Sequence, residues 1–319
     1  MAVIAGIDEA GYGPLLGPLV VSGVVFQTAP DLAERCLWKT LSASIGRRPT
    51  KKGRRLPIAD SKVLYDRQAG LWTLERSALV MLAASLDRPA SLRALLRLVA
   101  ADAEPVMDDY PWYRGFDPPL PVDGGTGDLG TRCNAVRRDL SQNGVTLRNV
   151  HCQPVLEGHF NELVARTRNK ASALMTVVLR LIDRVIRLGD DDTRIYVDHQ
   201  GGRVYYRDHL LTAFPEFELR IEHEDETRSA YRLVRGQRRI RLEFEVEGEK
   251  RQLPVALASI YSKYLRELFM IAVNRFWQEH VADLRPTAGY YGDGQRFIRQ
   301  IEPAIARHAI DRALVVRCR

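Results

Sequence analysis

The sequence is poor in cysteine. Its 319 residues contain four, which are far apart: Cys36, Cys133, Cys152 and Cys318. Their spacing fits neither a disulfide framework nor a thiolate zinc site. This excludes a small disulfide-stapled scaffold and favours free thiols in a reducing cytosol.

Long apolar runs are also lacking. The longest run, Leu15 to Phe26, contains glycine and proline and is too short to cross a bilayer. The apolar N-terminus carries no basic residues and is interrupted by Asp8 and Glu9, which is not typical of a signal peptide. We therefore expect a soluble, cytoplasmic protein with no membrane partner.

Basic residues are in excess. The chain has 47 Lys and Arg against 40 Asp and Glu, a net charge of +7 and a pI near 9.3. Such a surplus favours polyanionic partners, because Lys and Arg that neutralise phosphates release condensed counterions. A hydrophobic content of 45% and a charged content of 27% are ordinary for a soluble globular protein.

Hydrophobic periodicity predicts one α/β domain over residues 1–319, with a mixed central β-sheet flanked by helices. Ala2–Ile7 and Leu19–Phe26 read as neighbouring antiparallel strands around a Gly/Pro turn at 11–17. Further strands are expected at 145–154, 193–198 and 216–221. Helices are expected at 31–46, 67–96 with a break at Pro89, 160–188, 254–279 and 295–307.

Two segments read as insertions. The first, about 101–140, is rich in Asp, Gly and Pro, and we interpret it as an inserted loop that contains Trp112 and Tyr113. The second, about 232–252, alternates charged and apolar residues, which predicts a basic β-hairpin standing off the core. It is either a solvated hairpin or a clamp on a duplex. A basic loop at 46–55, with six Lys or Arg in ten residues, is either a second clamp on a duplex or a disordered loop.

The most informative stretch is the string Gly-Ile-Asp-Glu-Ala-Gly-Tyr-Gly-Pro, residues 6–14. Two acids at the end of a buried strand are costly unless they are paired or bound to metal. Asp8 and Glu9 are adjacent and should face opposite sides of a regular strand, so both serve one site only where the strand bends. Gly11 and Gly13 permit that bend. Solvated acids at the start of a turn would explain either acid alone.

This string resembles the N-terminal signature of ribonucleases HII and HIII, in which Asp-Glu-Ala-Gly is followed by Gly-X-Gly-Pro. Four further segments resemble that family's motifs, in the same order: Asp60-Ser61-Lys62, Tyr196-Val197-Asp198, Ala258-Ser259-Ile260 with Lys263 and Arg266-Glu267, and Gly289-Tyr290. Five matches across nearly the whole chain indicate a divergent member of the ribonuclease H type 2 family.

The resemblance implies an RNase H-like fold and four acids, Asp8, Glu9, Asp198 and Glu267, that hold two divalent ions, Mg²⁺ or Mn²⁺. Hard dications prefer oxygen ligands, and a metal pair about 4 Å apart can drive in-line phosphodiester hydrolysis. The implied protein is a monomeric endoribonuclease. Its implied substrates are the RNA strand of RNA–DNA hybrids and ribonucleotides embedded in DNA.

The resemblance also implies a set of substrate-binding residues: Gly11, Tyr12, Gly13, Lys62, Ser259, Lys263 and Tyr290. The two lysines are expected to contact the substrate backbone or balance the acids, and Tyr290 to stack on a sugar. Each has an alternative, since Lys62 could be a solvated loop residue, Tyr290 could pack a turn, and Ser259 could simply pack its helix.

Three positions depart from the family's pattern. Tyr12 replaces the Arg or Lys of the turn, so a phosphate contact is lost, although the glycine amides could still contact a 2′-hydroxyl. Glu267 replaces an Asp, and His199 follows Asp198 where a Gly is expected. These departures leave two alternatives open. One is a nucleic-acid-binding protein that has lost catalysis, and the other is a nuclease for a different substrate, such as structured DNA.

Overall fold

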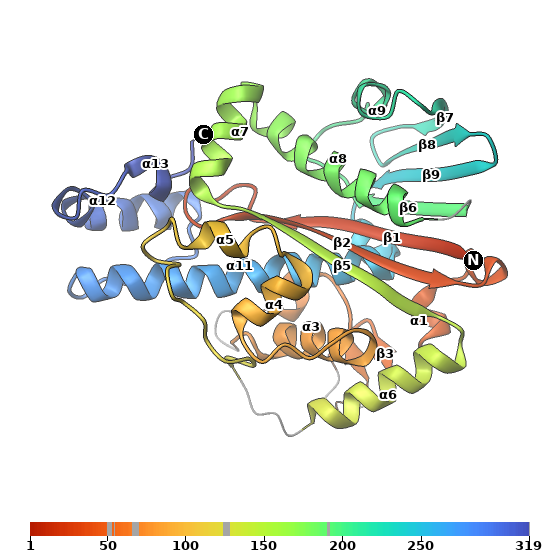
Figure 1. Ribbon diagram of the computed structural model, residues 1–319, viewed down its shortest axis with the longest axis horizontal. Coiled ribbons are helices and arrows are strands. Elements are labelled where there is room, and N and C mark those ends of the chain that lie inside the picture. The colour runs from red at the N-terminus through yellow and green to blue at the C-terminus, as the bar shows by residue number, and fades with distance from the viewer. Residues whose placement is uncertain (50–52, 54, 66–69, 124–127, 190–191, 319) are drawn as a thin grey trace.

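The computed structural model describes residues 1–49, 53, 55–65, 70–123, 128–189 and 192–318 (Figure 1). A seven-stranded sheet, in the order β5-β2-β1-β6-β9-β8-β7, runs through the molecule with helices on both of its faces. The expected mixed α/β architecture is therefore confirmed. No helix in the described ranges combines the length and the apolar character needed to cross a membrane.

The centre of the sheet is formed by the two strands that the N-terminal sequence predicts. β1 (Ala2–Ala10) and β2 (Leu19–Thr28) are antiparallel, with Ala2 opposite Thr28. β5 (Thr146–Val155) pairs with the outer edge of β2, and β6 (Asp192–Asp198) runs parallel to β1 on the other side. Both β1 and β2 are buried along nearly their whole length, which explains their continuous apolar runs.

The segment predicted to be a hairpin standing off the core belongs to the sheet instead. β9 (Arg238–Glu245) pairs in parallel with β6, β8 (Arg228–Arg235) pairs with β9, and β7 (Glu218–Glu224) completes the edge. The apolar residues of β9, Ile240, Leu242 and Phe244, are fully buried. Its charged residues alternate with them and occupy the opposite face. The end of the predicted hairpin is the short helix α10 (Gly248–Arg251).

Two long helices sandwich the sheet. α11 (Leu253–His280) packs along β1 and β2 on one face, and α8 (Lys170–Leu188) covers the other (Figure 1). The helix predicted over 160–188 is in fact two, because Arg168 at φ 56° ends α7 (Glu157–Thr167). Asn169 then caps α8 by accepting a hydrogen bond from the N–H of Ala171 at 2.7 Å.

Shorter elements complete the fold. The helix expected at 31–46 is instead three short elements: a 3-10 turn (Pro30–Leu32), the single-turn helix α1 (Leu37–Thr40) and strand β3 (Ile45–Gly46). The extended backbone of Cys36 separates the 3-10 turn from α1. The remaining elements are β4 (Leu56–Pro57), α2 (Ser61–Leu64), α3 (Trp72–Ser85), α4 (Leu92–Val99), α5 (Glu104–Met107), α6 (Leu129–Gln142), α9 (Arg207–Ala213), α12 (Tyr291–Arg307) and α13 (Arg312–Val315).

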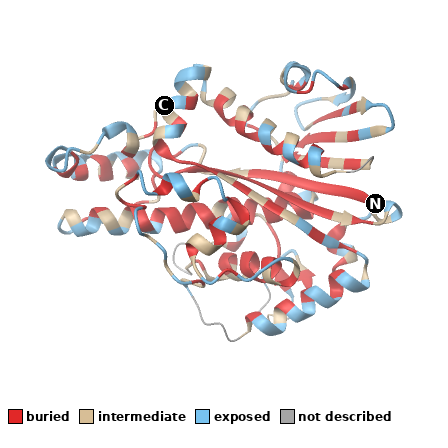
Figure 2. Cartoon of the chain, viewed as in Figure 1, coloured by how far each residue is buried: buried red, intermediate tan, exposed pale blue. Residues whose placement is uncertain are grey.

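The Pro/Gly-rich segment at 101–140 is not a loop on the surface. It contains α5 and most of α6, and several of its residues are buried (Figure 2). Trp112 and Tyr113 pack against aromatic rings of α11. The ring centroids of Tyr113 and Phe269 lie 5.0 Å apart in an edge-to-face arrangement. The aromatic side chains thus make this segment part of the core. Residues 124–127 of this segment lie outside the described residues, as do residues 50–52 and 54 of the predicted basic loop and residues 67–69 of the predicted helix.

Candidate active site

Two parallel strands bring the first acids together. Ile7 of β1 lies opposite Val197 of β6 in the last pair of this ladder, so Asp8 and Asp198 follow it side by side. The Asp8 carboxylate accepts a hydrogen bond from the N–H of Glu9 at 2.7 Å, and Asp198 accepts one from the N–H of Gly248 at 2.9 Å. The predicted juxtaposition of Asp8, Glu9 and Asp198 is therefore present at this edge of the sheet.

The turn after Glu9 requires glycine. Gly11 has φ 85°, and a Cβ there would lie 2.4 Å from Nε of Arg266. This close approach lets the chain reverse over α11 and keeps Glu9 beside Asp8 at the mouth of a cavity of about 300 Å³.

A fourth acid, Glu249, enters the same cavity from α10. Glu249 is 8% exposed, and its Oε2 atom has no hydrogen-bond partner among the described residues. Glu249 was not among the predicted acids, because it lies in the segment predicted to be a hairpin standing off the core. No sequence pattern singled it out, because its approach to Asp198, which accepts a hydrogen bond from the N–H of the preceding Gly248, depends on the fold.

The four carboxyl groups repel one another strongly. Burial first, and then the charge of Glu9, raise the pKa of Asp8 well above its usual value. Burial and the charge of Asp198 raise the pKa of Glu9 to about 8. Burial and the charges of Asp8 and Glu249 raise the pKa of Asp198 to about 9. Such a cluster needs protons or bound cations to offset its charge.

The donor set suits a hard divalent cation. All four side chains offer oxygen ligands, and Oε2 of Glu249 is buried without a partner in the described ranges. Within those ranges, no three or more His, Cys, Asp or Glu side chains already converge as a finished ligand set. The chemistry of these carboxylates therefore fits a metal ion, although their side chains do not form a preformed coordination geometry.

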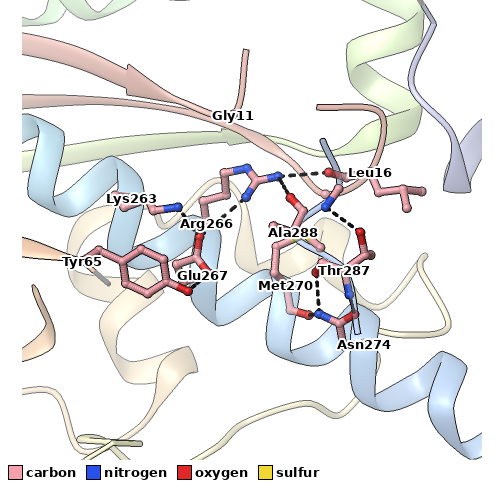
Figure 3. Close-up of polar contacts among 12 residues, drawn as sticks. Gly11, Leu16, Tyr65, Lys263, Arg266, Glu267, Met270, Asn274, Thr287 and Ala288 are labelled. Carbon is pink, nitrogen blue, oxygen red and sulfur yellow. Dashed lines mark hydrogen bonds and ion pairs between the residues drawn. The ribbon is translucent and has the colours of Figure 1, made fainter. Parts of the chain in front are cut away.

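Glu267, the expected fourth acid, lies elsewhere (Figure 3). Its carboxylate accepts a hydrogen bond from the hydroxyl of Tyr65 at 3.0 Å and forms an ion pair with Lys263. It does not line the cavity, and its charge is absent from the causes that shift the pKa values of Asp8, Glu9 and Asp198. The structure therefore places Glu249 in the cavity with Asp8, Glu9 and Asp198, whereas Glu267 is held outside it by Tyr65 and Lys263.

The predicted substrate-binding residues all line the cavity: Gly11, Tyr12, Gly13, Lys62, Ser259, Lys263 and Tyr290. Ser259 is buried, donates a hydrogen bond to the hydroxyl of Ser61 at 2.9 Å, and contacts the Asp8 carboxyl. It is therefore placed to orient Asp8. Tyr290 is 52% exposed, so its ring is open to a ligand.

Lysines from two elements line the cavity. Lys62 lies in the first turn of α2, where Asp60 accepts a hydrogen bond from its backbone N–H at 2.9 Å, and its charge lowers the pKa of Glu9. Lys263 lies 4.5 Å from the ring centroid of Tyr65. The cavity thus combines buried carboxylates with two lysines and an exposed aromatic ring.

The sequence has a relative of known class. A stretch of 125 residues, 39% of this chain, is 36% identical to ribonuclease HII of Pelotomaculum thermopropionicum and covers 44% of that protein. The chain thus spans less than half of the length of the curated relative that it matches. The match confirms the resemblance to the ribonuclease H type 2 family that the motifs predict. No protein-family model matches the chain.

Three solved structures that resemble this chain are named as ribonucleases HII, H2 and HIII. RNase HII from Archaeoglobus fulgidus, in a complex with PCNA, is 15% identical, with a TM-score of 0.41 over 99% of this chain and 94% of that one. Ribonuclease H2 from Pyrococcus horikoshii is 14% identical, with a TM-score of 0.42 over 98% and 92%. Bst-RNase HIII in complex with Mn²⁺ is 14% identical, with a TM-score of 0.48 over 99% and 66%.

Proposed function

We propose that this protein is a metal-dependent endoribonuclease that cleaves the RNA strand of RNA–DNA hybrids or ribonucleotides embedded in DNA, leaving a 5′-phosphate. One observation carries the proposal: Asp8, Glu9, Asp198 and Glu249 share one buried cavity beside motifs that resemble ribonuclease HII. The proposal keeps the monomeric, cytoplasmic protein that the sequence leads us to expect.

Asp8, Glu9, Asp198 and Glu249 would hold the divalent ions, Mg²⁺ or Mn²⁺. When bound, a pair of such ions supplies an activated water and stabilises the leaving oxygen. The donor chemistry and the unpartnered Oε2 of Glu249 support this assignment.

The surrounding side chains have separate tasks. Ser259 orients the Asp8 carboxyl, and the N–H of Gly248 fixes that of Asp198. Lys62 and Lys263 offer cations to the substrate backbone, while the half-exposed ring of Tyr290 offers a stacking surface for a sugar. Arg266 is buried behind the turn and holds the carbonyl oxygens of Leu16 and Ala288 (Figure 3).

The test is cleavage of two labelled duplexes, an RNA–DNA hybrid and a DNA duplex with one ribonucleotide, in Mg²⁺ and in Mn²⁺. Asp8→Asn is the matched variant, because it keeps the shape of the side chain and removes its charge. We expect cleavage by the wild type and none by Asp8→Asn. Tight binding without cleavage in either metal would instead identify a nucleic-acid-binding protein. Cleavage of structured DNA alone would identify a nuclease of different specificity.

A further inference from the structure

Arg317, two residues before the end of the chain, is buried beneath the Gly11-Tyr12-Gly13 turn. It is 1% exposed, and its guanidinium donates hydrogen bonds to the carbonyl oxygens of Gly11, Tyr12 (3.0 Å) and Gly17 (3.4 Å). The backbone N–H of Arg317 also donates to the carbonyl oxygen of Leu15 at 2.8 Å. The Arg317 side chain thus binds the backbone on both sides of the turn that follows Glu9, at Gly11 and Tyr12 and again at Gly17.

Several contacts hold the guanidinium in this position. It lies 3.8 Å from the ring centroid of Phe160, within cation–π range. The segment around it is tied to α7, because Asn161 donates to the carbonyl oxygens of Ala313 (2.8 Å) and Val316 (2.9 Å). Burying a cation is costly unless its donors are satisfied, and here the carbonyls of the turn provide most of the acceptors.

This arrangement fixes the direction of two amides. In a planar trans peptide the N–H points away from the C=O, so carbonyls turned toward Arg317 direct the N–H groups of Tyr12 and Gly13 to the opposite side. The cavity is lined by these same residues. Neither N–H has an acceptor within the described part of the chain, and a Cβ built on Gly13 would meet nothing within 4 Å.

The turn itself carries no cation. Tyr12 stands between the two glycines, and Arg266 anchors the other side of the turn through Leu16 (3.2 Å) and Ala288 (2.9 Å) (Figure 3). The guanidinium of Arg317 therefore lies beneath the backbone, where it can orient the amides but is buried too deeply to reach a substrate phosphate.

We propose that Arg317 is a positioning residue that aims the N–H groups of Tyr12 and Gly13 at the ribose 2′-hydroxyl, and so determines the preference for a ribonucleotide over a deoxyribonucleotide. This inference rests on the proposed function. Arg317 touches no substrate, so its loss should change discrimination and leave the general affinity for a duplex in place.

The test compares Arg317→Met and Arg317→Lys with Arg312→Met. Arg312 lies in the same C-terminal segment but is 57% exposed and pairs with Glu302, so it is a matched control. Fluorescence anisotropy in Ca²⁺ measures the affinity for a DNA duplex with one ribonucleotide and for the all-DNA duplex of the same sequence. We expect the ratio of the two affinities to fall about tenfold in Arg317→Met, the effect of losing one well-placed hydrogen bond. We expect a smaller fall in Arg317→Lys and none in Arg312→Met.

The outcomes separate the two proposals. If Arg317→Met does not fold, Arg317→Lys decides the question, because lysine keeps the charge without the planar fork of donors. A wild-type ratio in the folded Arg317 variants, or an equal loss of affinity for both duplexes, overturns the role of Arg317 alone. A wild-type protein that shows neither cleavage nor a preference for the ribonucleotide overturns the proposed function, and this inference with it.

Discussion

Replacing Glu249 and Glu267 one at a time by glutamine distinguishes the two candidate fourth ligands. Each change keeps the size of the side chain and removes one negative charge. Glu249 lies among Asp8, Glu9 and Asp198, whereas Glu267 is held by Tyr65 and Lys263 outside the cavity. The two variants are therefore matched in chemistry and differ in location.

The expected magnitudes follow from these locations. Two unit charges at 4 Å interact by about 4 kcal/mol at an effective dielectric constant of 20. A dication bound near Glu249 would therefore lose at least that much attraction when glutamine replaces Glu249. Since about 1.4 kcal/mol corresponds to a factor of ten, Glu249→Gln should weaken metal-dependent cleavage by roughly a thousandfold. Glu267→Gln loosens Lys263 instead, and we expect a loss of about tenfold, the lower end of the range typical of a residue that supports a functional group.

The assay is single-turnover cleavage of the hybrid, measured as a function of Mg²⁺ and Mn²⁺ concentration. Glu249→Gln should need far more metal for half-maximal activity, and Glu267→Gln should keep the wild-type metal dependence. The reasoning is refuted if Glu267→Gln shifts the metal dependence while Glu249→Gln leaves it unchanged.

Three further predictions concern the same region. Because burial and like charges raise the pKa values of Asp8, Glu9 and Asp198 above those of the unfolded chain, their contribution to stability is present at low pH and is lost as the pH rises from about 4 toward 9. The melting temperature in EDTA should fall over that range and recover with Mg²⁺, whereas a pH-independent difference between EDTA and Mg²⁺ would contradict the cluster. Tyr12→Arg should tighten duplex binding and steepen its salt dependence by about one phosphate contact; an unchanged slope in anisotropy titrations would show that position 12 does not face the backbone. Gly11→Ala should destabilise the protein by more than about 1 kcal/mol in denaturant unfolding, because its φ is 85° and the new methyl group would meet Arg266, and a wild-type midpoint would mean that the turn relaxes freely.

The sequence predicts those parts of the fold and site that depend on local patterns. The apolar runs of β1 and β2 have no competing interpretation, and acids at the ends of two strands meet whenever those strands are parallel neighbours. Asp8 and Asp198 could therefore be placed together without coordinates. The alternation of charged and apolar residues in β9 was also visible in the sequence. Such alternation shows that a strand has two different faces, but it does not show that α8 and α9 cover the apolar one.

Glu249 was missed for a similar reason. α10 has four residues, too few for a helical period, and its acid stands among other charged residues of a polar segment. Glu267 was chosen because a linear motif gives the order of residues, whereas side-chain direction on a helix changes with each position. The burial of Trp112 and Tyr113 was obscured by the Pro- and Gly-rich residues around them, since composition reports turns more readily than packing.

The position of positive charge around the Gly11-Tyr12-Gly13 turn affects how the protein would distinguish RNA from DNA. A cation within the turn would face the substrate and contribute to binding of any duplex, because phosphates are common to RNA and DNA. Tyr12 removes that contribution, and Arg317 places its charge on the far side of the same peptides. Amide donors held in this way act on the 2′-hydroxyl, the group by which a protein distinguishes RNA from DNA. The expected result is a protein whose general affinity depends on Lys62, Lys263 and other surface cations, while its selectivity depends on the geometry of two backbone amides.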